Sequence, residues 1–318
     1  MPGPGHSRPS DLVVADGELY FVYETEDGDS RFARSDGTPA GTHVIADIDP
    51  SSTDDRIQGL TWLPELDLFA FVGRTPAAGN ELWVSDGTAA GTRMVADINP
   101  GPDDSRPELW LAHDGALYFG AYDPVHGYEL RRYTPGGTAA ELVVDLTPGP
   151  ESGGPLAMTS FAGQLILSMT DDGADIELWR SDGTAAGTEL LQDINTRPQT
   201  GSLPSHFFVT GDLLLFVADG GGTGRELWKL TKAAVSDTPG DDSGDPGDDP
   251  GSGPGSDDDD GGSSGGDDSG PPPPSGGSAP APSGGGGGGA FGGLGIAALI
   301  VIAGTRRFAG SKPRVGRR

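Results

Sequence analysis

The sequence predicts an all-β protein, a β-propeller built from four-stranded repeats of about 48 residues, with four full repeats and one partial repeat. The first observation is a twelve-residue word, ELWVSDGTAAGT at Glu81–Thr92, which recurs as ELWRSDGTAAGT at Glu177–Thr188. The second is its spacing: weaker copies begin at residues 31, 129 and 226, so the steps between copies are 50, 48, 48 and 49 residues. The third is Asp-Gly between short apolar runs, which is typical of tight β-hairpins.

The first repeat shows the expected order of elements. The dipeptide Asp16-Gly17 separates two apolar runs, at Leu12–Ala15 and Glu18–Tyr23. A type I′ turn fits there because both of its central residues need a positive φ. A third strand is expected at Arg31–Arg34 and a closing strand at His43–Ile48, after the SDGTPAGT loop.

The later repeats follow the same plan. Their first hairpins are expected at Leu109–Ala121, Thr159–Met169 and Phe207–Val217, and their closing strands at Arg93–Ile98, Glu141–Leu146 and Glu189–Ile194. In the second repeat Pro64 stands where the tight turn would be, and proline cannot donate to a strand ladder. A longer turn is therefore predicted at this hairpin.

Repeated sheets of this size must pack against one another, because a single four-stranded sheet cannot bury both of its faces. Packing around an axis also leaves only short edges exposed. The fifth repeat, His206–Leu230, has three strands, so the repeats predict either a five-bladed ring or part of a larger one. The segment Met1–Ser10 lacks the apolar region of a secretory signal, which is consistent with a truncated start.

Composition limits the function classes. The chain has no cysteine, which excludes disulfides and thiolate metal sites. The formal net charge is −28, and a surface this acidic repels phosphate backbones, so nucleic acid is not expected as a partner. No HExxH, P-loop, dinucleotide or G-x-S-x-G motif occurs in a fitting context.

The repeated word, followed by an apolar strand and D-I-x-P-G, resembles the ELWxxDGT repeat proteins, a group of bacterial surface or secreted proteins thought to form propellers. The resemblance covers roughly residues 11–232. The first copy departs from the pattern at Arg31-Phe32-Ala33, and the third copy departs at Arg131 and at Tyr133–Gly136. The resemblance implies architecture and location, and it supplies no catalytic residues.

The rest of the chain divides by composition into an N-terminal segment and three segments after the repeats. Residues 1–10 are expected to be disordered, and residues 233–289 form an acidic Gly/Pro/Ser/Asp-rich linker that is too poor in apolar residues to fold. Residues 290–305 are an apolar transmembrane or sorting helix, and residues 306–318 are a basic tail expected in the cytoplasm. The repeats would then be displayed outside the cell, on a stalk.

The apolar segment is open to two interpretations. A glycine-rich approach, a short helix and an arginine cluster resemble GlyGly-type C-terminal sorting signals, which a rhomboid-like protease cuts. The alternative is a tail anchor that is retained in the membrane. The residues expected to act in either case are Gly288, Gly289, Phe291, Leu294, Ile296, Leu299, Ile300, Val301, Ile302, Arg306 and Arg307.

The conserved positions of the word are expected to be structural. Asp-Gly and Gly-Thr suit a tight connection between strands, although Asp36, Asp86 and Asp182 also suggest a weak calcium alternative. The tryptophans are expected in the cores between blades, with sugar stacking as the alternative, and the glutamates are expected to accept hydrogen bonds at blade junctions. The motif positions are Glu81, Leu82, Trp83, Asp86, Gly87, Thr88, Gly91, Thr92, Glu177, Leu178, Trp179, Asp182, Gly183, Thr184, Gly187, Thr188, Glu226, Leu227 and Trp228.

These observations favour a non-enzymatic surface protein that binds or scaffolds an extracellular protein or glycan, without a cofactor. A secreted hydrolase that uses the central face of the propeller is one alternative, and a purely structural surface protein is another. The five histidines show no metal-ligand spacing, and no His or acidic cluster unique to one repeat stands out. We expect any function to lie where the copies differ.

Overall fold

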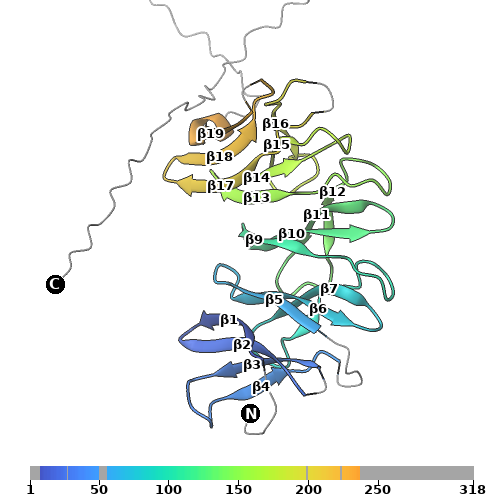
Figure 1. Ribbon diagram of the computed structural model, residues 1–318, viewed down its shortest axis with the longest axis vertical. Coiled ribbons are helices and arrows are strands. Elements are labelled where there is room, and N and C mark those ends of the chain that lie inside the picture. Colours follow the sequence, from blue (N-terminus) through green and yellow to red (C-terminus); the bar gives the residue numbers. More distant parts are fainter. Residues whose placement is uncertain (1–7, 27, 50–55, 198–199, 223, 237–318) are drawn as a thin grey trace, which may run out of the picture. The chain divides into compact units, whose positions relative to one another are not determined.

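The computed structural model describes residues 8–26, 28–49, 56–197, 200–222 and 224–236 (Figure 1). The described residues belong to one compact unit. The predicted linker, the apolar helix and the basic tail lie outside the described residues. Among the residues that are described, no helix is long and apolar enough to cross a membrane.

The described chain forms five antiparallel sheets, in agreement with an all-β protein built from four-stranded units (Figure 1). Sheet 1 consists of β1 (Ser10–Ala15), β2 (Glu18–Glu24), β3 (Ser30–Ser35) and β4 (His43–Ala46), in that order. Each strand pairs with the next strand in sequence, so every sheet is a simple meander.

The other sheets repeat this order. Sheet 2 contains β5 (Arg56–Leu63), β6 (Leu68–Thr75), β7 (Gly79–Ser85) and β8 (Arg93–Met94). Sheet 3 contains β9 (Glu108–His113), β10 (Ala116–Asp123), β11 (Gly127–Tyr133) and β12 (Glu141–Val144). Sheet 4 contains β13 (Ala157–Phe161), β14 (Gln164–Met169), β15 (Glu177–Ser181) and β16 (Glu189–Gln192). Sheet 5 has three strands, β17 (Ser205–Thr210), β18 (Leu213–Asp219) and β19 (Arg225–Thr231).

The hairpin turns have the predicted backbone. Asp16 and Gly17 have φ values of 49° and 80°, and Ala162 and Gly163 have φ values of 55° and 78°. These values are those that a tight turn between twisted strands requires. At Pro64 the turn is longer, as predicted, since β5 ends at Leu63 and β6 begins at Leu68.

The closing strands are shorter than predicted. They end at Ala46, Met94, Val144 and Gln192, before the Asp-Ile or Asp-Leu pair that was expected to complete each strand. In sheets 2 and 4 the amides of Ile98 and Ile194 donate instead to a buried glutamate, Glu81 or Glu177. The glutamate side chain therefore accepts the hydrogen bond that a neighbouring strand was expected to accept. The periodicity of the sequence does not reveal this exchange.

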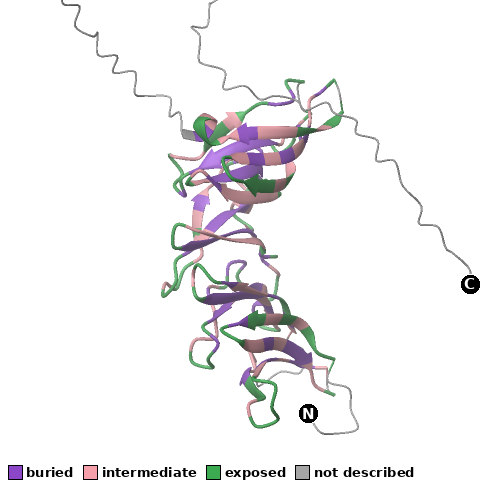
Figure 2. Cartoon of the chain, turned by 90° about the vertical axis from the view of Figure 1, so that its left-hand side faces the viewer, coloured by how far each residue is buried: buried purple, intermediate pink, exposed green. Residues whose placement is uncertain are grey.

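Four apolar cores lie between the successive sheets, where Figure 2 shows buried residues on the strands. Sheets 1 and 2 share one core, sheets 2 and 3 the next, sheets 3 and 4 the third, and sheets 4 and 5 the fourth. The first strands of neighbouring sheets are in contact, β1 with β5, β5 with β9, β9 with β13 and β13 with β17. Sheets 2, 3 and 4 therefore bury both faces against their neighbours in sequence, and sheets 1 and 5 each bury one face.

A short helix that the sequence pattern did not predict, α1 (Lys232–Ser236), follows β19. It occupies the chain position at which other repeats carry the SDGT loop. The backbone carbonyl of Val235 accepts a hydrogen bond of 2.7 Å from Nη1 of Arg180 in sheet 4. The side chain of Val235 is buried in the core between sheets 4 and 5, so the folded unit extends past the predicted boundary at residue 232.

Candidate functional site

The SDGT loops are closed by their own hydrogen bonds. In the second repeat Oδ1 of Asp86 accepts from the amide of Thr88 at 2.9 Å and from its hydroxyl at 2.6 Å. The Thr88 hydroxyl in turn accepts from the amide of Gly91 at 3.0 Å. The same bonds recur at Asp36 and Asp182.

The two glycines of the loop are required for different structural reasons. Gly87 has a φ of 82°, which favours glycine. A Cβ on Gly91 would collide with the Asp86 carboxylate. Bonds from the Thr38 side chain and amide lower the pKa of Asp36, and the equivalent side-chain bond from Thr184 is the main cause that lowers the pKa of Asp182.

One carboxylate oxygen of each loop aspartate, Oδ1, accepts hydrogen bonds from the neighbouring threonine. Within the described ranges, no group of three or more His, Asp or Glu side chains is placed to hold a metal ion. The calcium alternative at Asp36, Asp86 and Asp182 stays a prediction.

The first residue of the word is a buried hydrogen-bond acceptor. Oε2 of Glu81 accepts from the amide of Ile98 at 3.1 Å and from Oγ of Ser105 at 2.7 Å, and Oε1 accepts from the amide of Asn99 at 3.2 Å. Burial raises the pKa of Glu81 to about 7, although the three donors favour the carboxylate. One side chain therefore holds both ends of the segment that leads to sheet 3.

The equivalent glutamates repeat this role. Glu177 accepts from the amides of Ile194 at 2.9 Å and Ser202 at 2.7 Å. Glu129 accepts from the amide of Gly153 at 2.6 Å, and burial raises its pKa to about 7. Glu81, Glu129 and Glu177 thus accept hydrogen bonds at junctions between repeats, in agreement with the expectation for these three positions.

The two terminal repeats lack the buried glutamate. In the first repeat Arg31 takes the position and forms ion pairs with Asp29 and Asp47. In the fifth repeat Glu226 is only half-buried.

The tryptophans of the word lie in the cores between sheets. Trp83 packs on the core that sheets 1 and 2 share, and Trp179 is buried in the core of sheets 3 and 4. Trp228 packs on the core of sheets 4 and 5. These positions agree with the expectation of a core role.

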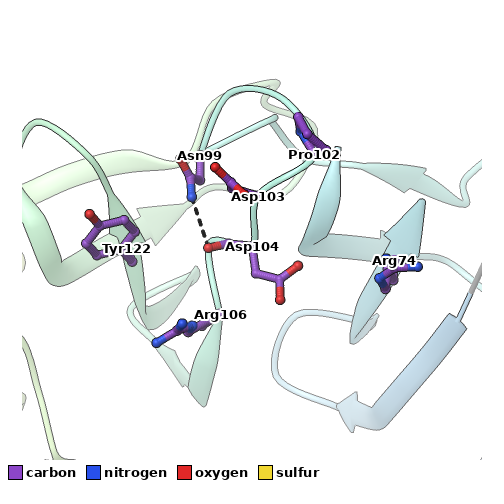
Figure 3. Close-up of a pocket in the computed structure, with 7 residues that line it drawn as sticks. All are labelled: Arg74, Asn99, Pro102, Asp103, Asp104, Arg106 and Tyr122. Atoms are coloured by element: carbon purple, nitrogen blue, oxygen red, sulfur yellow. Dashed lines mark hydrogen bonds between the residues drawn. The ribbon is translucent and has the colours of Figure 1, made fainter. Parts of the chain in front are cut away.

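A polar cavity of about 460 Å³ lies where sheet 2 leads into sheet 3 (Figure 3). In Figure 3 the side chains of Asp103 and Asp104 lie between Tyr122 and Arg106 on one side and Arg74 on the other. The full lining is Arg74, Asn99, Pro102, Asp103, Asp104, Arg106 and Tyr122. The cavity therefore presents two guanidinium groups, two carboxylates, an amide and an aromatic ring.

The frame of this cavity is held by hydrogen bonds within the backbone and between side chains and the backbone. The amide of Asn80 donates to Oδ1 of Asp104 at 2.9 Å, and Nδ2 of Asn99 donates to the carbonyl of Asp104 at 3.1 Å. The amide of Tyr122 donates to the carbonyl of Ser105 at 2.7 Å. Arg106 is exposed and has a φ of 50°, a backbone conformation that is uncommon for a side-chain-bearing residue.

The third repeat carries a charged cluster at a position where three other repeats have tryptophan. Arg131 is buried and forms an ion pair with Asp123, and Nδ1 of His126 lies 2.9 Å from Oδ2 of Asp123. Burial alone would raise the pKa of Asp123, but the bonds from His126 and Val125 together with the charge of Arg131 lower it. The sequence showed the missing tryptophan, but it did not show that the arginine pairs with an aspartate on the neighbouring strand.

A second histidine contacts a serine across a junction. Nδ1 of His113, at the end of β9, lies 2.8 Å from Oγ of Ser160 in β13. Burial lowers the pKa of His113, and the nearby charge of Asp114 partly opposes this shift. The residues are 47 positions apart, one repeat period, and come from different sheets. The sequence could not pair them because the contact forms only when sheets 3 and 4 pack.

The chain resembles parts of several solved peptidase structures. A puromycin hydrolase is 18% identical with a TM-score of 0.46, and the match covers 73% of this chain and 37% of that chain. Oligopeptidase B from Leishmania major is 15% identical with a TM-score of 0.47, covering 73% and 34% of the two chains. Prolyl oligopeptidase B from Galerina marginata is 11% identical with a TM-score of 0.47, and the match covers 70% of this chain and 31% of that chain.

The chain spans about a third of the length of each of these structures. At these values the likeness carries no argument about the activity of this chain. Comparison with protein families and with curated proteins finds no match.

Proposed function

We propose that the chain is a non-enzymatic binding module that recognises a glycan through the polar cavity between sheets 2 and 3. The cavity is the observation that carries the proposal. It presents Arg106, Asp103 and Tyr122 together on a frame that the buried carboxylate of Glu81 holds at both ends.

The lining suits a ligand rich in hydroxyl groups. Guanidinium groups donate, carboxylates accept, and an amide side chain does both, so each can bond a sugar hydroxyl. The ring of Tyr122 offers an apolar surface with a polar end. A cavity of about 460 Å³ falls in the size range of small-ligand sites, which is roughly 300–1,000 Å³.

We place this module in a propeller displayed at the cell surface. The meander sheets, the four cores between them and the contacts among first strands support blade-like packing. The acidic linker, the apolar segment and the basic tail of the sequence support display on a stalk, with either anchoring in the membrane or release by a sorting protease.

A glycan array probed with the purified chain tests the proposal. We expect a defined set of glycans to bind, and we expect Asp103→Asn and Arg106→Gln each to weaken that binding about tenfold, because each removes a charged hydrogen-bonding group. The matched control is Asp171→Asn, which alters an exposed aspartate in a turn of sheet 4. Silence across the array, or equal loss in the control, would contradict a glycan site at this cavity.

A second candidate function rests on the contact between His113 and Ser160. A serine hydroxyl within hydrogen-bond distance of a histidine nitrogen is the arrangement that activates a nucleophile in serine hydrolases. A fluorophosphonate probe distinguishes the candidates. Covalent labelling that disappears in Ser160→Ala would favour a hydrolase, whereas an unlabelled chain that binds glycans would favour the binding module.

A further inference from the structure

The leucine of the repeated word reveals an uncovered sheet face. Leu82, Leu130 and Leu178 are each 0% exposed, because each lies in the core between its own sheet and the next sheet. Leu227 has the same position in sheet 5 and is 41% exposed. None of the described residues covers sheet 5 on this side.

The same side of β18 is apolar from Leu213 to Val217, and Lys229 of β19 lies opposite Leu215 on it. Along β18, Leu214, Phe216 and Ala218 are buried toward sheet 4, and the alternate residues are half-buried. Phe208 on β17 is 63% exposed. We call this surface the sheet 5 face, and it consists of Phe208, Leu213, Leu215, Val217 and Leu227.

Within the described part of the chain, sheet 1 has an uncovered face on its opposite side, the side that points away from sheet 2. Val14 pairs with Leu19 as Trp62 pairs with Phe69 in sheet 2, so Val14 has the position at which sheet 2 contacts the sheet before it. Val14 is 69% exposed and Leu12 is 61% exposed. We call this surface the sheet 1 face, and it consists of Leu12, Val14, Leu19, Phe21 and Val44.

We propose that the sheet 5 face of one copy of this chain docks on the sheet 1 face of a second copy. The two faces are the two halves of an interface that the chain already forms four times, once between each pair of successive sheets. A second copy therefore supplies the surface that the internal repeats show to fit. The contact joins different surfaces, so it is head to tail and can extend beyond two copies.

Analytical ultracentrifugation of the full chain tests this association. We expect a mean mass that rises with concentration past that of a dimer. Val14→Glu and Leu227→Glu should each remain monomeric alone, because each variant has lost one of the two faces. Mixed in equal amounts they should form a dimer that grows no further, since one intact face of each kind remains. The matched control is Val125→Glu, at a valine that is 63% exposed in a turn of sheet 3, and it should associate as the unaltered chain does.

Three results would overturn the proposal. The unaltered chain could stay monomeric at every concentration, or either face variant could associate normally, or the two variants could fail to dimerise when mixed. Far-ultraviolet circular dichroism shows whether each variant is folded. Should Val14→Glu fail to fold, Leu12→Glu on the same face replaces it.

Discussion

Glu81 accepts a hydrogen bond of 2.7 Å from Oγ of Ser105, 24 residues further along the chain. The same carboxylate accepts from the amides of Ile98 and Asn99, so it closes the segment that lines the polar cavity. The buried Glu81 carboxylate thus accepts hydrogen bonds from backbone amides that would otherwise pair with a neighbouring strand.

Replacing Glu81 with alanine should destabilise the fold by about 3 kcal/mol, because three donors lose a buried partner. Urea unfolding measures the change. Glu226→Ala is the control, since the equivalent glutamate in sheet 5 is half-buried, and it should cost less than about 1 kcal/mol. Equal losses in the two variants would show that the bonds at Glu81 contribute little.

Stability should depend on pH through Glu81 and Glu129, because burial raises the pKa of each to about 7 from 4.5. A carboxyl with a higher pKa in the fold binds its proton more tightly there. Its contribution is therefore fully present below pH 4.5 and is lost as the pH rises through about 7.

The loss should be on the order of 2 kcal/mol for each carboxyl. Urea unfolding at pH 5 and pH 8 compares the unaltered chain with the double variant Glu81→Gln/Glu129→Gln, in which neither group titrates. The double variant should lose less stability between the two pH values. If the unaltered chain and the double variant lose the same stability between pH 5 and pH 8, neither carboxyl titrates in this range.

Gly91→Ala should destabilise the second repeat, because the added methyl group would collide with the carboxylate of Asp86. We expect a loss of about 1–3 kcal/mol, the usual cost of overpacking. Gly222→Ala is the matched control, since Gly222 has an ordinary φ and a Cβ there would make only a van der Waals contact of 3.9 Å with Arg197, so its change should stay within about 0.5 kcal/mol.

The double variant Asp86→Ala/Gly91→Ala isolates the collision, since removing the carboxylate makes room for the methyl group. Its loss should be smaller than the sum of the two single losses. Additive losses would show that the two residues are not coupled.

Trp179→Ala should cost about 3–5 kcal/mol, because Trp179 is buried in the core of sheets 3 and 4. Trp228→Ala should cost less, since Trp228 is only partly buried. Thermal unfolding, followed by tryptophan fluorescence and by circular dichroism, shows which of the two variants is less stable. The opposite order would contradict the placement of these rings.

Much of the sheet architecture could be predicted because it follows from local chemistry. Asp16-Gly17 adopts positive φ at both positions, and Pro64 cannot pair within a ladder, so the turns follow from the residues themselves.

The contacts of the candidate site could not be predicted from local sequence patterns. The partner of Arg131 lies on a neighbouring strand and that of His113 on a neighbouring sheet, and no sequence motif pairs these residues. Glu81 was expected to accept hydrogen bonds, but the residues that donate to it could not be named.

The sequence by itself determined the repeat, its strand order and its turns, since periodicity and backbone preference act within a few residues. Only the tertiary structure decided where each closing strand ends, which residues line the cavity and which sheet faces stay uncovered. The reason is physical. A buried carboxylate such as Glu81 bonds whatever donor packing brings to it, and whether Leu227 is buried or exposed depends on the presence of a neighbouring sheet.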